Sequence, residues 1–150
     1  ALTQDALPKE VAGIPVWLYD NADLAAAGAD VVMLCTSSGT PVINAAALAP
    51  TTLITSISTN VANAHEIDPS LLANLDVYCD YRRTTPASAG DMKLAAAVGW
   101  LPEQIRGDLP DLMAGTATAP SWQRPAFFRS IGLGLEDVAA AFAVLSAIRA

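Results

Sequence analysis

The sequence has little cationic charge. Its 150 residues contain eight Lys and Arg against fifteen Asp and Glu, which gives a formal net charge of −7 at pH 7. Nucleic acids and anionic membrane surfaces attract clustered Lys and Arg, and here only Arg82 and Arg83 are adjacent. The composition therefore argues against both a nucleic-acid partner and a membrane partner.

Metal-site, disulfide and membrane signals are also missing. His65 is the single histidine and has no Cys/His cluster beside it, so no metal site is expected. Cys35 and Cys79 lie inside two apolar runs, and we interpret them as small buried hydrophobic residues rather than a disulfide. No apolar run approaches the ~20 residues that cross a bilayer, and no secretion signal is recognisable at the N-terminus. We expect a cytoplasmic protein.

Short apolar runs alternate with helical segments along the chain. Val31 to Cys35 is a continuous apolar run bounded by turn residues, which is typical of a parallel strand covered on both faces. The pattern predicts strands at about 15–19, 31–36, 53–58, 77–80 and 127–131, and helices at about 2–12, 22–28, 69–75, 88–98, 108–115 and 135–149. This alternation indicates one domain of parallel α/β architecture.

Small polar residues and glycines follow three of these predicted strands. Thr36-Ser37-Ser38 follows the second strand, Ser58-Thr59-Asn60 the third, and Gly132-Leu133-Gly134 the last. Open parallel sheets bind ligands at the carboxyl ends of their strands, and small side chains let backbone amides approach a bulky ligand. The residues by themselves do not name that ligand. A polar-aromatic segment from Tyr78 to Arg83 also follows a strand, and we interpret it as a solvated loop.

Several segments resemble, in order, one family of cofactor-binding proteins. The run from Gly28 to Ser38 with Pro41-Val42-Ile43 is similar to the middle of the cofactor domain in the ornithine cyclodeaminase/μ-crystallin family. Glu66-Ile67-Asp68, Gly90-Asp91 and Gly107-Asp108-Leu109 follow in the family's order, and Ser130 to Asp137 resembles its closing signature S-x-G-x-x-x-E-D. The similarity extends over almost the whole chain.

The resemblance implies a Rossmann-type parallel sheet with helices on both faces and a site for NAD(H) or NADP(H). By that resemblance, Thr36, Ser37 and Ser38 would approach the nicotinamide-side ribose. Ser56, Ile57 and Ser58 would line the nicotinamide, and Gly132 and Leu133 would close over it. Glu136 and Asp137 fall in the first turn of a helix, where its macrodipole favours acids, so we interpret them as structural.

The sequence departs from the cyclodeaminase pattern after the third strand. Cyclodeaminases carry an aspartate there, which activates water, and a lysine four residues later; the aligned residues here are Asn60 and Ala64. A carboxamide cannot act as a carboxylate base, so deamination of ornithine is in doubt. Asn60 is instead a candidate catalytic residue that orients the substrate or a water by hydrogen bonding. The alternative is that Asn60 is a turn residue.

The sequence also lacks the Gly-rich loop that holds the cofactor pyrophosphate at a helix N-terminus. We therefore expect residues 1–150 to be the C-terminal portion of a dinucleotide-binding domain. The helix at 135–149 has apolar residues around much of its circumference. We expect it to pack on an absent N-terminal substrate and dimerisation domain, through which a homodimer would form.

The function implied is NAD(P)H-dependent reduction of a cyclic imino acid of the Δ1-pyrroline-2-carboxylate or Δ1-piperideine-2-carboxylate type. A reductase passes hydride to a preformed C=N carbon and does not need the deaminase aspartate. Three alternatives stay open: ornithine cyclodeaminase, an alanine-dehydrogenase-like enzyme acting on an open-chain substrate, and a non-catalytic cofactor-binding protein like the μ-crystallins.

Overall fold

The computed structural model of the protein describes residues 7–59 and 62–149. The strands are β1 (Glu10–Val11), β2 (Ile14–Pro15), β3 (Val31–Leu34), β4 (Leu53–Ser56), β5 (Asp76–Cys79), β6 (Gly107–Asp108) and β7 (Ala126–Arg129). The α-helices are α1 (Ala22–Ala26), α2 (Thr85–Ser88), α3 (Gly90–Ala97), α4 (Leu109–Ala114) and α5 (Gly134–Arg149), and the 3-10 turns are η2 (Ala45–Ala47), η3 (Pro69–Asn74) and η4 (Pro102–Gln104).

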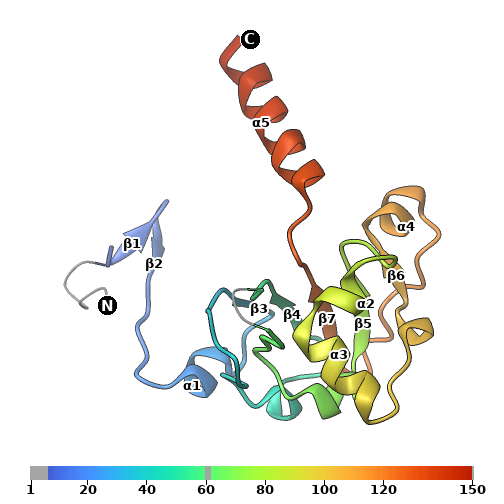
Figure 1. Ribbon diagram of the computed structural model, residues 1–150. Helices are drawn as coiled ribbons and strands as arrows, with labels where there is room; N and C mark the ends of the chain where they lie inside the picture. The colour runs from blue at the N-terminus through green and yellow to red at the C-terminus, as the bar shows by residue number, and fades with distance from the viewer. Residues whose placement is uncertain (1–6, 60–61, 150) are drawn as a thin grey trace.

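Five of the strands form one parallel sheet in the order β3-β4-β7-β5-β6 (Figure 1). The last strand in sequence, β7, lies in the middle between β4 and β5, so the chain crosses over the sheet to reach it. Parallel strands joined by helices and turns confirm the expected α/β class. The short strand β6 was not predicted, because its two residues also begin the segment that caps α4.

One face of the sheet carries the hydrophobic core. Ile54 and Phe127 are fully buried at its centre, where they join the same core cluster as Met92 of α3 and Leu72 of η3. In Figure 1 α2 and α3 lie in front of the sheet, which they cover on this side. Because successive strand residues point to opposite faces, the alternating burial of β3 follows from a single covered face there.

The opposite face is covered only in part by the residues that the structure describes. Val31 and Met33 of β3 are exposed. Nearer β5 and β7, α4 and the segment after it stand over the sheet. A cavity of about 500 Å³ lies between Leu112 of α4 and Trp122 of that segment on one side and Thr55 and Phe128 of the sheet on the other. Among the described residues, helices therefore cover less of this face than we expected from a sheet with helices on both faces.

The N-terminal region differs from its prediction. A helix was expected over residues 2–12, of which residues 2–6 lie outside the described part of the chain. Glu10–Val11 and Ile14–Pro15 form an antiparallel hairpin instead. Ala12 and Gly13, which connect them, both have positive φ (51° and 82°). A two-residue hairpin turn of this kind needs positive φ at both positions and cannot continue a right-handed helix.

The strand predicted at 15–19 is also wrong. Val16–Tyr19 has no regular structure, and its large side chains are exposed, with Trp17 77% accessible. Hydrogen bonds to a neighbouring strand are what make an extended segment a strand. Val16 donates one backbone hydrogen bond to the Lys9 carbonyl (2.9 Å), but Val16–Tyr19 forms no strand ladder with the described residues. In Figure 1 this segment runs as an open connection between the hairpin and α1, at the side of the molecule where β3 forms the sheet edge.

The remaining elements agree with the sequence apart from their bounds. Asn21 caps α1 by accepting from the N–H groups of Asp23 and Leu24, and Asp108 caps α4, which ends at the left-handed Gly115. The helix expected at 88–98 is α3, and the extended Ala89 separates it from the short helix α2, which was not predicted. The helix expected at 69–75 is the 3-10 turn η3. Cys35 is exposed, contrary to its interpretation as a core residue, whereas Cys79 is buried; both are free thiols.

Candidate functional site

The carboxyl ends of the five strands lie in register. Leu34 pairs with Ser56, Ser56 with Arg129, Arg129 with Cys79, and Cys79 with Asp108. The segments that begin at these strand ends or up to two residues later therefore start at the same edge of the sheet. Three of them are the segments that the sequence analysis singled out, at 36–38, 56–58 and 130–133.

The segment after β3 is a compact polar turn. The Thr36 hydroxyl accepts a hydrogen bond from the Ser38 N–H (3.1 Å), and the Ser38 hydroxyl donates to the Thr40 carbonyl (2.7 Å). Thr36 and Ser37 are exposed and Ser38 is half-buried. The turn is therefore shaped by its own side chains and presents Thr36 and Ser37 outward.

Ser56, which ends β4, and Ser58, which follows it, both turn inward. Ser56 and Ser58 are buried, and both hydroxyls are engaged, that of Ser56 with Glu66 (2.7 Å) and that of Ser58 with the Ser38 carbonyl (3.4 Å). Ile57 between them is 51% exposed. Of the three predicted residues in this segment, only Ile57 offers its side chain to a ligand, while the contact between Ser58 and Ser38 joins two of the predicted segments.

A buried carboxylate lies beneath both segments. Glu66 has no exposed surface, and it accepts hydrogen bonds from the Thr36 N–H (2.7 Å), the Ser56 hydroxyl (2.7 Å) and the Ser58 N–H (3.4 Å). Burial by itself raises the pKa of Glu66, but the hydrogen bonds from these three residues outweigh it and hold the pKa below its ordinary value. Glu66 is therefore a carboxylate at neutral pH.

The buried guanidinium of Arg129, the last residue of β7, also binds the Ser56–Ser58 segment. Arg129 donates to the carbonyls of Ser56 (3.2 Å), Ser58 and Ser130 (2.7 Å) and forms an ion pair with Asp91 (2.9 Å), and neither charged side chain is exposed. The two atoms that face each other in this ion pair, Arg129 Nε and Asp91 Oδ2, form no hydrogen bond with any described residue. Burial raises the pKa of Asp91, and Arg129 offsets only part of that rise.

The segment after β7 is fixed by Asp80. This carboxylate, which has no exposed surface, accepts from the Ser130 hydroxyl (3.1 Å) and the Ile131 N–H (2.7 Å). Gly132 follows with φ at 74°, where a side chain would be strained, and is exposed. Leu133 lines a cavity of about 650 Å³ together with Tyr81 and Met113. The interpretation of 78–83 as a solvated loop is therefore wrong for Tyr78 and Asp80, which are buried.

Asn60, the candidate catalytic residue, lies outside the described residues. Among its neighbours, Ala64 is buried, and the His65 ring bonds through Nδ1 with the Asn63 carbonyl (2.8 Å). Sequence reasoning named Glu66, Asp91 and Asp80 only as parts of family-like segments or of a loop, and did not consider Arg129. A charged residue at the end of an otherwise apolar strand, as in Phe127-Phe128-Arg129, was the available signal.

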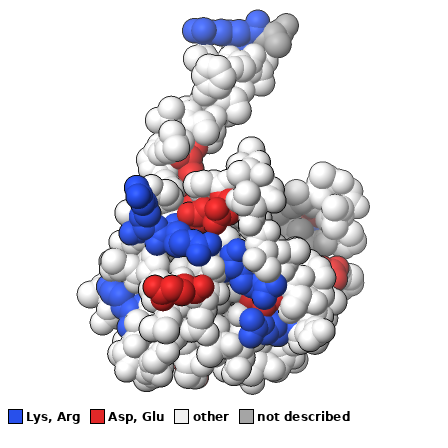
Figure 2. All heavy atoms as spheres, turned by 90° about the vertical axis from the view of Figure 1, so that its right-hand side faces the viewer, with Lys and Arg blue, Asp and Glu red and all other residues white. Residues whose placement is uncertain are grey.

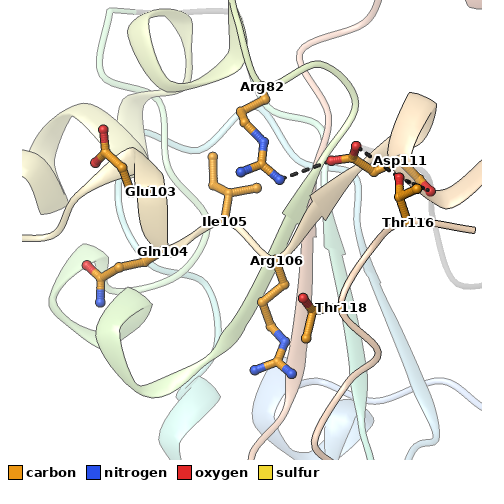
Figure 3. Close-up of a pocket in the computed structure, with 8 residues that line it drawn as sticks. All are labelled: Arg82, Glu103, Gln104, Ile105, Arg106, Asp111, Thr116 and Thr118. Atoms are coloured by element: carbon orange, nitrogen blue, oxygen red, sulfur yellow. Dashed lines mark hydrogen bonds and ion pairs between the residues drawn. The ribbon is translucent and has the colours of Figure 1, made fainter.

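A polar hollow of about 570 Å³, separate from the strand-end segments, flanks the edge strand β6 (Figure 3). Arg82 points across it to Asp111 and forms an ion pair (3.0 Å). Arg106 binds Asp76 (3.2 Å) and the Ala119 carbonyl (2.6 Å). None of the predicted cofactor residues lines this hollow, and its arginines are already neutralised by carboxylates.

Figure 2 shows that positive and negative side chains are also interspersed on the molecular surface. Basic and acidic side chains lie next to one another on the face that includes this hollow, whereas most of α5 carries neither. Within the described residues no group of three or more potential metal-ligating side chains occurs. No described helix is long and apolar enough to span a bilayer.

Comparison with known proteins gives a consistent result. Residues 4–150 match the model of the ornithine cyclodeaminase/mu-crystallin family. An NAD(P)H-dependent anabolic L-arginine dehydrogenase, DauB of Pseudomonas aeruginosa, is 59% identical over 117 residues, which are 77% of this chain and 37% of that protein. A Δ1-pyrroline-2-carboxylate reductase of Paracoccus denitrificans is 36% identical over 104 residues, 67% of this chain and 33% of that protein.

A solved structure is similar as well. The iminosuccinate reductase of Paracoccus denitrificans, in complex with NAD⁺, superposes with a TM-score of 0.72 at 29% identity, covering 84% of this chain and 39% of that one. The chain thus spans less than two fifths of the length of these relatives. All three are oxidoreductases by name.

Proposed function

Because the chain belongs to the ornithine cyclodeaminase/mu-crystallin family, we propose that the protein catalyses NAD(P)H-dependent reduction of the imine of an amino acid. The observation that carries this proposal is the 59% identity over 117 residues to an NAD(P)H-dependent L-arginine dehydrogenase. NAD(P)H supplies a hydride, which the C=N carbon of the imine accepts.

The strand-end segments fit the nicotinamide-ribose half of such a cofactor. Exposed Thr36 and Ser37 offer hydroxyls to a ribose, Ile57 offers an apolar surface to a ring, and Gly132 leaves open space where a side chain would stand. Their neighbouring charges, Glu66, Asp80 and Arg129, are buried and already bonded. These segments therefore suit an uncharged group better than a pyrophosphate.

We propose that residues 1–150 form the C-terminal portion of the dinucleotide-binding domain. Among the described residues the outer edge of β3 has no strand partner, and Val31 and Met33 are exposed. Both observations support this proposal, since a central parallel strand is normally paired and covered. The exposed apolar side chains of α5, among them Phe142 and Ile148, support its packing on a substrate and dimerisation domain in a homodimer. The free thiols Cys35 and Cys79 accord with a cytoplasmic location.

Two substrate classes are candidates. The relation to an arginine dehydrogenase favours an open-chain 2-imino acid, formed from a 2-oxo acid and ammonia. The relation to a Δ1-pyrroline-2-carboxylate reductase, together with Asn60 in place of the deaminase aspartate, favours a cyclic imino acid. In either case the Asn60 carboxamide would orient the substrate or a water by hydrogen bonding.

The test is an assay of the full-length protein with NADPH and with NADH. Oxidation of the cofactor is followed by absorbance with each of two substrates: 2-oxo-5-guanidinovalerate plus ammonia, and Δ1-pyrroline-2-carboxylate. Turnover of either substrate supports imine reduction and identifies its class. Tight cofactor binding without turnover of both would instead favour a binding protein, and release of ammonia from ornithine would favour a cyclodeaminase.

A further inference from the structure

One buried carboxylate ties together two segments of the proposed cofactor site. The Oε1 atom of Glu66 accepts from the Thr36 N–H, and its Oε2 atom accepts from the Ser56 hydroxyl and the Ser58 N–H. Thr36 follows β3 and Ser58 follows β4, so Glu66 spans the junction between two neighbouring strands. Its place in the chain, ten residues after Ser56, brings it back under the segment that it binds.

Hydrogen bonds at both ends restrain the conformation of the Ser56–Ser58 segment. Glu66 binds the hydroxyl of Ser56 and the N–H of Ser58, while Arg129 binds the carbonyls of the same two residues. The side chain of Ile57 stands exposed between these anchored residues. The position of Ile57 relative to Thr36 is therefore set by charged groups that themselves have no exposed surface.

Glu66 also keeps its charge without a cationic partner. Within residues 7–59 and 62–149 no Lys, Arg or His nitrogen lies within 4.0 Å of the Glu66 carboxylate. A buried carboxylate without a cation is costly unless hydrogen bonds compensate it, and the three donors here are all in the proposed cofactor segments. An apolar residue of similar size would leave the Thr36 N–H, the Ser56 hydroxyl and the Ser58 N–H without this acceptor.

Resting on the proposed function, we propose that Glu66 is a positioning residue of the cofactor site. Its carboxylate fixes Thr36 and the Ser56–Ser58 segment at the spacing that holds the nicotinamide-ribose half of NAD(P)H. Glu66 has no exposed surface of its own, so it acts through these two segments.

The test is Glu66→Gln in the full-length protein. Glutamine keeps the size of the side chain but offers one acceptor oxygen instead of two, so the three donors cannot all be satisfied. We expect the KM for NAD(P)H to rise about tenfold while kcat at saturating cofactor falls less than about threefold, because binding is lost without loss of a reacting group.

Asp76→Asn is the matched control. Asp76 is a buried carboxylate with a comparable set of donors, namely Arg106, Arg124 and the Ser121 N–H, but it lies at the start of β5, the opposite edge of the sheet. If Glu66 were only structural, both variants would change the KM in proportion to their loss of thermal stability. We expect Asp76→Asn to lower the Tm at least as much and to leave the KM within about twofold.

Ser56→Ala is a second test of the role of Glu66, because it removes only the one hydroxyl that donates to this carboxylate. Because the Ser56 hydroxyl is buried against Glu66, its loss acts through the same carboxylate. We expect a smaller rise in KM, and a Glu66→Gln/Ser56→Ala double variant no worse than about twofold beyond Glu66→Gln alone, since changes to one interaction are not additive.

The outcomes separate this inference from the proposed function. Cofactor binding is measured by fluorescence titration with NADPH and NADH, independently of turnover. If the wild-type protein binds NAD(P)H and the Glu66→Gln variant binds it equally well, or if the Asp76→Asn variant is weakened as much, the positioning role of Glu66 is refuted while the proposed function stands. If the wild-type protein binds neither cofactor, both fail.

Discussion

Charged residues at the carboxyl edge of the sheet are hidden from solvent in this protein. Arg129, Asp91, Glu66 and Asp80 have no exposed surface, and each is bonded to the segments at that edge or to another member of this group. An ion pair in this setting stabilises little relative to apolar residues, but removal of one partner leaves a buried charge uncompensated. Loss of one partner should therefore cost more than loss of both.

Arg129→Met removes the cation beside Asp91 and the donors to three carbonyls. We expect the free energy of unfolding to fall by about 3–5 kcal/mol, because Asp91 is left buried and unpaired. Denaturant titration measures the change. The Asp91→Asn/Arg129→Met double variant serves as control and should recover part of the loss; if it is less stable than Arg129→Met, the ion pair is not the cause.

Asp76→Asn should show a pH-dependent loss of stability. Burial raises the pKa of Asp76, but the Ser121 N–H, Arg124 and Arg106 outweigh it and leave the pKa below its ordinary value of 3.8. A depressed carboxylate pKa contributes stability above the unfolded value that is lost as pH falls through the folded value. We expect the variant to lose about 2 kcal/mol near neutral pH, since its arginine partners are partly exposed.

The measurement for Asp76→Asn is the free energy of unfolding of both proteins from about pH 7 down to about pH 2. The difference between them should be constant at neutral pH and should shrink below about pH 4. A difference that grows on acidification would contradict the assignment of Asp76 as an ionised group.

The elements of this fold are short, and their junctions decide its geometry. Helix α3 begins at Gly90, directly after the extended Ala89, and reaches the segment that precedes Glu66. A Cβ at Gly90 would lie 2.2 Å from the Asn63 carbonyl carbon and 2.3 Å from the Ala64 oxygen. The helix can approach this closely only because the residue has no side chain, and it thereby supports the turn that carries Glu66.

Gly90→Ala should therefore destabilise the fold although alanine is the better helix former. We expect a loss of about 2–3 kcal/mol, because backbone atoms rather than a flexible side chain must move. Gly134→Ala is the matched control: Gly134 opens α5, and a Cβ added there would have no neighbouring atom within 4 Å. It should be neutral or more stable by up to about 1 kcal/mol. Thermal unfolding of both variants distinguishes close packing from helix propensity.

At the scale of the whole molecule, much apolar surface has no cover among the described residues. Val31 and Met33 on the sheet, Trp17 before α1, and Phe142 and Ile148 on α5 are all exposed. Figure 1 shows α5 projecting upward away from the sheet, with the N-terminal hairpin standing apart on the left. Soluble monomers rarely expose so many large apolar side chains together, which accords with the proposal that these residues are part of a larger domain.

Residues 1–150 by themselves should bind NADPH only weakly. The cofactor pyrophosphate carries two negative charges, which helix N-termini after a Gly-rich turn usually meet; this sequence has no such turn, and its net charge is −7. We expect a dissociation constant above about 100 μM by calorimetric titration. The full-length protein is the control. Micromolar binding by the 150 residues would show that the strand-end segments suffice.

The sequence by itself determined those elements whose signals are local. The apolar runs around Val32, Ile54, Val77 and Phe127 are buried strands, and Asn21, Asp108 and Gly115 mark helix ends, because burial of an apolar run and capping of a helix depend on a few neighbouring residues. The ordered series of family-like segments likewise identified the family.

Only the tertiary structure decided the features that depend on distant partners. Val16–Tyr19 has the composition of a strand but no strand to pair with among the described residues, and Ser56 and Ser58 look like ligand-facing residues but turn inward to Glu66. Arg129 and Asp91 are 38 positions apart in the chain and meet only in the core. A side chain's direction and a charge's partner are fixed by packing and hydrogen bonding across the fold, and local sequence does not contain them.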